Sequence, residues 1–201
     1  MRFTSAKGKI NRALGMIIYE NRGAVRAFER HPQPPGMHMR RGKQSNYGMA
    51  MSEKKKIKHY YGMHERQLLR FFQLAAKSPE NTGEALLVLC ERRLDNVVRR
   101  ATLTRTRPQA RQGINHGHLR VNGKKVDICS YLVKAGDVIE VAPRPNVLRV
   151  YRELVSRPEG AAADWLHIDT EALRVTVQRL PTAVDISLPV EANRVVELLS
   201  R

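Results

Sequence analysis

The sequence has little of what secreted proteins, membrane proteins and many enzymes need. Its only cysteines are Cys90 and Cys129, too few for a disulfide framework. Each lies beside an apolar neighbour, which favours a small buried side chain over a ligand or nucleophile. There is no long apolar run, no lipidation signal and no secretory signal peptide. We therefore expect a cytoplasmic protein without a membrane partner.

Acidic residues are also scarce. The 201 residues include 36 Lys and Arg against 19 Asp and Glu, which gives a net charge of +17. The excess lies in the first three quarters of the chain, because residues 151–201 carry more acidic than basic side chains. A surface that only keeps the chain soluble seldom needs such an imbalance. Because hydrophobic residues make up 42% of the chain, we expect a folded protein that binds a polyanion, most simply a nucleic acid.

Recognisable catalytic motifs are missing as well. The sequence has no Gly-rich phosphate loop with lysine, no His-Glu-x-x-His, no Cys-x-x-Cys and no Gly-x-Ser-x-Gly. Asp95 is a candidate acid, but it stands among arginines, where a charge-assisted hydrogen bond that orients an arginine is the simpler role. We expect neither enzymatic activity nor a cofactor.

Residues 92–141 form the segment around which the chain is organised. Leu94, Val97, Val98 and Ala101 follow the spacing of an amphipathic helix, with basic residues on another face. A second helix should begin at a Thr106 cap, with Pro108 in its first turn and Gln109 at the capping-box position, and should stop at Gly117. No acidic residue occurs between Arg99 and Lys125.

A small sheet should follow these two helices. The alternating run His118-Leu119-Arg120-Val121 leads into Asn122-Gly123, the strongest two-residue hairpin signal. A second turn at Ala135-Gly136-Asp137 precedes a strand over 138–141. The alternation over 165–169 and 173–178 predicts two paired strands that extend this sheet, with Trp165 as a packing anchor.

This pattern resembles the RNA-binding domain named after ribosomal protein S-four. The resemblance rests on these runs in order: Arg93-Leu94-Asp95-Asn96-Val97-Val98, Thr106-Arg107 with Ala110-Arg111-Gln112, His116-Gly117-His118, Val121-Asn122-Gly123-Lys124, Ser130-Tyr131, and Gly136-Asp137-Val138-Ile139. Such a domain also occurs in RNA-modifying enzymes and synthetases, so the flanking segments must identify the protein.

The flanks extend the resemblance to the family of ribosomal protein S-four over nearly the whole chain. The matching runs are Arg2-Phe3-Thr4, the stretch from Glu29 to Gly36, Tyr61-Gly62 with Glu65-Arg66-Gln67, and Asn81-Thr82-Gly83-Glu84. Many members hold zinc with four cysteines near the N-terminus. Here the corresponding positions fall near Gly8, Asn11, Asn21 and Arg26, so we predict the zinc-free form.

The residues outside 92–141 are expected to be mostly helical, apart from the two strands over 165–169 and 173–178. Three prolines make the stretch from His31 to Gly36 extended, and the first 45 residues otherwise offer only a possible helix around Leu14 to Tyr19. Ser45 to Gly48 reads as a turn, and Thr82 as a helix cap. Helices are also expected over 147–156 and 191–200.

Together with the resemblance, these segments predict an α+β fold in three parts. Residues 1–45 form an extended basic N-terminal arm. Residues 46–91, completed by 181–201, form a discontinuous helical domain. Residues 92–180 form an inserted S-four-type RNA-binding domain, with two helices followed by a small, mostly antiparallel sheet and a core over 92–141.

The resemblance implies a structural protein of the small ribosomal subunit. It would bind a multi-helix junction in the 5′ domain of small-subunit ribosomal RNA, nucleate assembly of the subunit body and contribute to translational accuracy. Its implied neighbours are ribosomal proteins S-five and S-twelve and messenger RNA where it enters the subunit, on a cytoplasmic or organellar ribosome. The alternatives are a free-standing RNA-binding factor, or an RNA-modifying enzyme with an unrecognised site.

The expected RNA contacts combine cations for phosphates with polar side chains that fix the register of binding. They are Arg2, Lys43, Lys54, Lys55, Lys56, Lys58, Tyr61, Arg66, Arg70, Arg93, Asn96, Arg99, Arg100, Thr106, Arg107, Arg111, Gln112, Asn115, His116, His118, Arg120, Asn122, Lys124 and Lys125.

Overall fold

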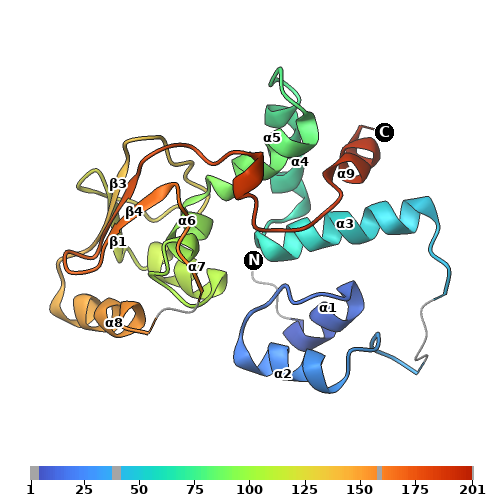
Figure 1. Ribbon diagram of the computed structural model, residues 1–201, viewed down its shortest axis with the longest axis horizontal. Coiled ribbons are helices and arrows are strands. Elements are labelled where there is room, and N and C mark those ends of the chain that lie inside the picture. The colour runs from blue at the N-terminus through green and yellow to red at the C-terminus, as the bar shows by residue number, and fades with distance from the viewer. Residues whose placement is uncertain (1–4, 38–41, 158–159, 201) are drawn as a thin grey trace. The chain divides into compact units, whose positions relative to one another are not determined.

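The structure is a computed structural model that describes residues 5–37, 42–157 and 160–200 (Figure 1). The chain forms two compact units. The first contains the chain up to Leu86 together with the segment from Leu188 onward, and the second runs from Leu87 to Ser187. The chain therefore leaves the first unit once and returns to it near its C-terminus.

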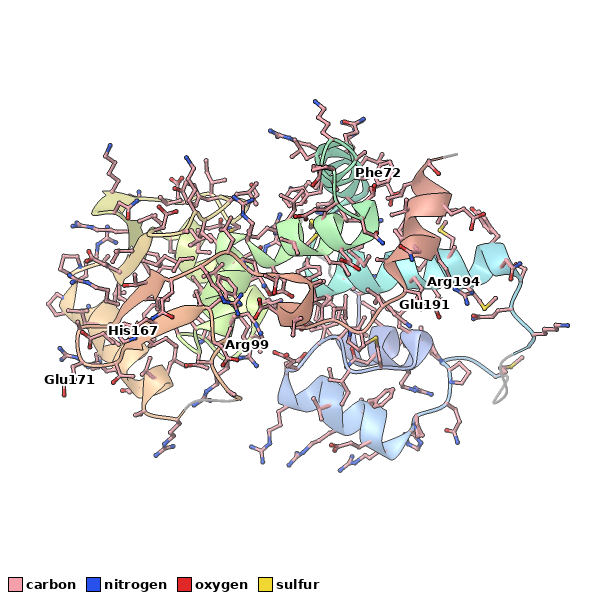
Figure 2. The ribbon with its side chains drawn as sticks, turned by 45° about the horizontal axis from the view of Figure 1, so that its top comes forward. Phe72, Arg99, His167, Glu171, Glu191 and Arg194 are labelled. Carbon is pink, nitrogen blue, oxygen red and sulfur yellow. The ribbon has the colours of Figure 1, made fainter. Side chains whose placement is uncertain are left out.

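The first unit is helical. Its elements are α1 (Lys7–Leu14), α2 (Arg22–Arg30), α3 (Asn46–Tyr60), α4 (Glu65–Ala75), the beginning of α5 (Thr82–Glu91) and α9 (Ala192–Leu199). Helix α9, predicted from the tail, packs on α3 and α4 and buries Val195 completely. Its first turn carries the ion pair between Glu191 and Arg194 (Figure 2). The tail thus completes a core that begins far earlier in the sequence.

The N-terminal segment corrects one prediction. The expected helix around Leu14 to Tyr19 was wrong, because α1 ends at Leu14 and Gly15 takes a left-handed conformation with φ 69°. The buried Asn11 then fixes the following loop. Its Oδ1 accepts from the backbone N–H groups of Ile18 (3.1 Å) and Tyr19 (2.9 Å), and its Nδ2 donates to the carbonyl of Tyr19 (3.1 Å). Part of the expected extended arm is therefore a pair of packed helices, α1 and α2.

The proline-rich stretch behaves as predicted. His31 to Gly36 contains no helix or strand and is mostly exposed. The Arg12 side chain of α1 donates from Nε to the carbonyl of Gln33 over 2.9 Å. This bond holds the extended stretch along the helix pair.

Two helix starts also differ from the sequence prediction. Ser45 to Gly48, expected as a turn, opens α3, because Ser45 Oγ accepts from the backbone N–H of Gly48 over 3.2 Å. The cap of α5 is Asn81 rather than Thr82, since Asn81 Oδ1 accepts from the backbone N–H of Gly83 over 2.9 Å. In both cases a side-chain oxygen satisfies an N–H group that has no partner within the helix.

Asn81→Ala is therefore expected to cost about 1 kcal/mol of stability, the usual loss for a helix cap. Thr82→Ala is the matched control and should change stability by less than about 0.5 kcal/mol. Urea unfolding of the two variants measures the difference. Equal losses would contradict the assignment of Asn81 as the cap.

The second unit begins with the two predicted helices, α6 (Leu94–Arg100) and α7 (Arg107–Asn115). The predicted stripe of α6 is confirmed, because all four of its apolar side chains are fully buried. Thr106 caps α7 by accepting from the backbone N–H of Gln109 at 3.4 Å. The Gln109 side chain, however, accepts from Arg105 N at 3.0 Å, one residue before the expected capping-box partner. Gly117, with φ 66°, stands just past the end of α7 as predicted.

Five short antiparallel strands follow, in the order β2-β1-β3-β5-β4. Their bounds are β1 (Leu119–Val121), β2 (Lys124–Lys125), β3 (Val138–Val141), β4 (Leu166–Asp169) and β5 (Arg174–Val177). The predicted hairpin is confirmed, since Asn122 and Gly123 have φ values of 51° and 75° between β1 and β2. The pairing of β5 with β3 confirms that the last two strands extend the sheet.

One hydrophobic core joins the helices and the sheet of the second unit. It contains Ile114 of α7, Ile139 of β3, Val175 of β5 and Trp165, all fully buried. Tyr151 joins it from α8 (Pro145–Val155), and a short 3-10 helix, η1 (Ala183–Asp185), follows the sheet. The α+β fold expected from the sequence is confirmed.

Candidate nucleic-acid interface

A buried ion pair fixes the start of α6. Arg93 Nε donates to Asp95 Oδ1 at 3.1 Å and its Nη2 to Oδ2 at 2.7 Å, and both side chains are almost completely buried. Arg111 Nε of α7 lies 3.6 Å from the same carboxylate. Asp95 therefore orients an arginine, as the sequence suggested, and it also links α6 to α7.

A second buried network surrounds Asn96. Its Oδ1 accepts from Arg107 Nε at 2.8 Å, and its Nδ2 donates to a carboxylate oxygen of Glu91. The other oxygen of Glu91 accepts from the backbone N–H (3.1 Å) and the hydroxyl (2.6 Å) of Ser187. Glu91 and Asn96 are almost completely buried, and Arg107 is only 8% exposed. The network therefore joins α5, α6 and α7 to Ser187, the last residue of the second unit.

These networks correct part of the predicted interface. Arg93, Asn96 and Arg107 were expected to contact RNA, but they are buried and bonded inside the second unit. Tyr61, also expected to contact RNA, is only 2% exposed and packs edge-to-face on Tyr60. A buried side chain cannot reach a phosphate or a base, so we remove these four from the proposed surface.

The remaining predicted residues of α6 and α7 reach the surface to different degrees. Gln112, Asn115 and His116 are exposed, while Arg99 (labelled in Figure 2), Arg100 and Arg111 are half-buried. Arg100 Nη2 also donates to the carbonyl of Asp185 over 3.4 Å. Thr106 is half-buried and serves as the cap of α7. Arg105, exposed between the two helices, was not predicted, although its position in the acid-free stretch could have suggested it.

The β1–β2 hairpin carries a group of exposed cations. Arg120 stands opposite Lys125 in the strand register, and Lys124 lies next to the turn. Asn122 acts within the fold: its Nδ2 donates to Asp137 Oδ1 and its Oδ1 accepts from Val138 N, both at 2.9 Å. We therefore assign Asn122 to the hairpin rather than to RNA. The three cations are free to face a phosphate backbone.

A row of aromatic rings lies at the C-terminal end of α7. The ring centroids of His116 and His118 are 5.7 Å apart, and those of His118 and Tyr151 are 6.2 Å apart. Burial lowers the pKa of His118, with smaller contributions from the charges of His116 and Arg144. His118 is half-buried, whereas His116 is exposed at the surface.

The predicted lysine run of the first unit is mostly engaged within the fold. Lys54 and Lys58 of α3 donate to the Glu65 carboxylate of α4, at 2.9 and 2.6 Å, and Lys56 pairs with Glu53 at 2.6 Å. The hydrogen bond from Lys58 is the main cause of the lowered pKa of Glu65. These three lysines hold helices in place, so the structure leaves only Lys55 of the run exposed.

Other predicted cations of the first unit are accessible. Lys43, Arg66 and Arg70 are exposed, and the last two are one turn apart on α4. Arg2 lies outside the described residues.

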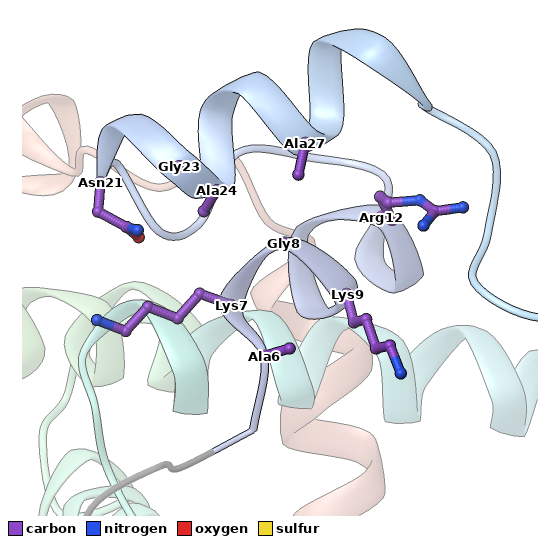
Figure 3. Close-up of a pocket in the computed structure, with 9 residues that line it drawn as sticks. All are labelled: Ala6, Lys7, Gly8, Lys9, Arg12, Asn21, Gly23, Ala24 and Ala27. Atoms are coloured by element: carbon purple, nitrogen blue, oxygen red, sulfur yellow. The ribbon is translucent and has the colours of Figure 1, made fainter.

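A hollow of about 400 Å³ lies between α1 and α2 (Figure 3). Its lining includes Gly8, Ala24 and Ala27, and the Lys7 side chain extends toward Asn21 while Lys9 and Arg12 point away from it.

No His, Cys, Asp and Glu side chains gather at metal-binding spacing in the described parts of the chain. Among those same residues, no helix has both the length and the apolar character needed to cross a bilayer.

The fold and its surface define a class of protein. A small α+β module that contains an acid-free basic stretch from Arg99 to Lys125, joined to a basic helical unit, is typical of proteins that hold folded RNA. Family comparisons divide the chain in the same order: residues 2–91 match the ribosomal protein S4/S9 N-terminal domain, and residues 92–139 match the S4 domain.

Similar proteins cover the whole chain. The small ribosomal subunit protein uS4 of Rhodopirellula baltica is 58% identical over 200 residues, which cover 100% of this chain and 99% of the relative. The uS4 proteins of Corynebacterium ammoniagenes (41% identical; 100% and 99% covered) and Aquifex aeolicus (40%; 96% and 95%) are also similar. The chain therefore belongs to the uS4 family of small ribosomal subunit proteins, and the resemblance predicted from its sequence is confirmed.

Proposed function

We propose that this chain is a structural, non-catalytic constituent of the small ribosomal subunit that binds its ribosomal RNA directly. The site is a multi-helix junction in the 5′ domain, where binding nucleates assembly of the subunit body and influences translational accuracy. Family membership supports the ribosomal role, and the basic surface of the second unit supports direct RNA binding.

The observation that carries the proposal is the acid-free stretch from Arg99 to Lys125, which forms the end of α6, the whole of α7 and the β1–β2 hairpin. Its cations would neutralise phosphates, and its polar side chains would fix the register of binding. The proposed contacts are Arg99, Arg100, Arg111, Arg120, Lys124 and Lys125, with Gln112, Asn115, His116 and His118.

The first unit contributes further cations to the proposal. Lys43, Lys55, Arg66 and Arg70 are exposed and would track phosphates of the same RNA. Ribosomal proteins S-five and S-twelve and the messenger RNA where it enters the subunit are the proposed neighbours. RNA junctions of this kind are recognised by shape and 2′-hydroxyl groups more than by base sequence.

The test is binding of the full chain to a 5′-domain transcript, against an unrelated structured RNA of equal length, over rising salt. If the six cations of the second unit each neutralise one phosphate, the slope of the logarithm of the binding constant against the logarithm of the salt concentration is expected to be roughly −4 to −5, or steeper. We call this slope the salt slope. Preference for the 5′ domain should survive at high salt, with protections at one junction. Equal binding to both RNAs would favour a free-standing RNA-binding factor instead.

Arg111→Ala should weaken binding to both RNAs by similar factors and reduce the salt slope by about 1, because a phosphate contact carries no sequence information. Lys134→Ala, which removes an exposed cation outside the proposed surface, is the matched control and should change neither quantity. Salt titrations of the two variants decide the outcome. An unchanged slope for Arg111→Ala would remove this residue from the interface.

A further inference from the structure

Helix α8 has two clearly different faces. Tyr151 is buried, and Val147, Leu148 and Leu154 are half-buried, at the three- and four-residue spacing of an inward helix face. The opposite face is exposed and basic, with Arg149 and Arg152 on the helix and Arg144 and Arg157 at its two ends. We call these four residues the α8 arginine row: Arg144, Arg149, Arg152 and Arg157.

The row differs from the other arginines of the C-terminal part of the chain. Arg174, Arg179 and Arg194 each pair with a carboxylate. Within the described part of the chain, no member of the α8 arginine row lies within ion-pair distance of a carboxylate. The exposed face contains a single acidic residue, Glu153. A face that only keeps a protein soluble would mix charges of both signs.

The packing of Tyr151 fixes where this face lies. A Cβ at Gly113 of α7 would stand only 2.3 Å from the Tyr151 hydroxyl, so α8 can lie this close to α7 only because that position is glycine. Burial also raises the pKa of Tyr151 to about 12. The helix is thereby held at the C-terminal end of α7, beside the His118 ring.

Arg144 connects the row to the proposed interface. It lies two residues after Ala142, whose backbone N–H donates to the carbonyl of His118 over 2.7 Å. His118 follows α7 and is one of the residues proposed to face RNA. From there the row continues along α8 through Arg149 and Arg152. A phosphate backbone that leaves α7 beside His118 would therefore meet further guanidinium groups, which bind phosphate oxygens through two parallel hydrogen bonds.

We propose that the α8 arginine row is a second phosphate-binding surface, which engages a neighbouring segment of the RNA bound by α7 and the hairpin. The inference rests on the proposed function, because it takes the same RNA as the partner. It adds contacts that lie outside the S4-domain match, which ends at residue 139.

The test compares Arg149→Ala/Arg152→Ala with Lys77→Ala/Lys134→Ala, a control that removes two exposed cations elsewhere. Binding to the 5′-domain transcript is measured over a salt series, with circular dichroism to verify folding. The arginine double variant should bind about tenfold more weakly and lower the salt slope by roughly 1.4 to 1.8, the value for two phosphate contacts. The control should remain within about twofold of the wild type.

The possible outcomes separate the inference from the proposed function. Equal effects of the two double variants would overturn the inference, since α8 would then be only a solvated face. If the wild-type chain binds the unrelated RNA equally well, the proposed function fails. A loss confined to the arginine double variant on both RNAs would still support the row as a phosphate-binding surface.

Discussion

Replacing Arg93 by alanine is expected to destabilise the protein by about 3 kcal/mol, because it leaves the buried carboxylate of Asp95 without its main partner. The two side chains are 1% and 3% exposed, and their closest contact is 2.7 Å. Arg111 remains 3.6 Å from the carboxylate and compensates in part, which places the loss at the lower end of the range for broken buried pairs. Urea unfolding measures the loss.

The same variant tests the reassignment of Arg93 from RNA contact to structural residue. Because its guanidinium is buried, Arg93→Ala should leave the salt slope of RNA binding unchanged while it lowers stability. Arg174→Ala, which breaks the exposed pair with Glu140, is the matched control and should cost less than about 1 kcal/mol. The double replacement Arg93→Met with Asp95→Leu should regain most of the lost stability, because it removes both charges.

A reduced salt slope for Arg93→Ala, with unchanged stability, would overturn this assignment and return Arg93 to the interface. Stability and salt slope therefore separate the two roles. Neither depends on knowing which nucleotides the protein contacts.

Local signals in the sequence predicted most of the second unit. The apolar stripe of α6 and the turn at Asn122-Gly123 each depend on residues close together in the chain, and both formed as expected. The start of α5 was less certain, because Asn81 and Thr82 are both good caps and only the backbone conformation decides between them.

Burial of polar residues could not be predicted from the helical pattern. Arg93 and Asn96 follow the basic face of α6, but whether this face meets water depends on distant segments. The Glu91 carboxylate bonds both Asn96 and Ser187, which is 96 positions further along the chain. No periodicity within α6 contains that information, so the sequence assigned both residues to RNA.

The α8 arginine row was missed for a different reason. Two of its four members, Arg152 and Arg157, lie in the segment after residue 150, which has more acidic than basic side chains, so counting charge by segment divided the row and concealed the clustering. The helix itself was expected, but its exposed face became clear only when Tyr151 was found against α7. Charge counted for each helix face would have found the row, whereas charge counted for each segment did not.

Trp165→Ala is the other replacement with a large expected effect, a loss of about 3 to 5 kcal/mol. Trp165 is fully buried in the core of the second unit, and its indole N–H has no hydrogen-bond partner among the described residues. Trp165→Phe is the matched control, because it keeps an aromatic ring and sacrifices no hydrogen bond. Its cost should be about 1 to 2 kcal/mol. Urea unfolding compares the two variants.

The role of Trp165 can also be measured without a variant, since it is the only tryptophan in the chain. A packed indole in a dry core should keep its emission maximum and intensity when RNA is added. A base-stacking platform would be quenched instead, because stacking brings a base onto the ring. Quenching that saturates with RNA would contradict the packing role. Unchanged emission when all of the protein is bound to RNA would show that Trp165 does not stack on a base. Any contact with a base would then be made by an exposed side chain such as His116.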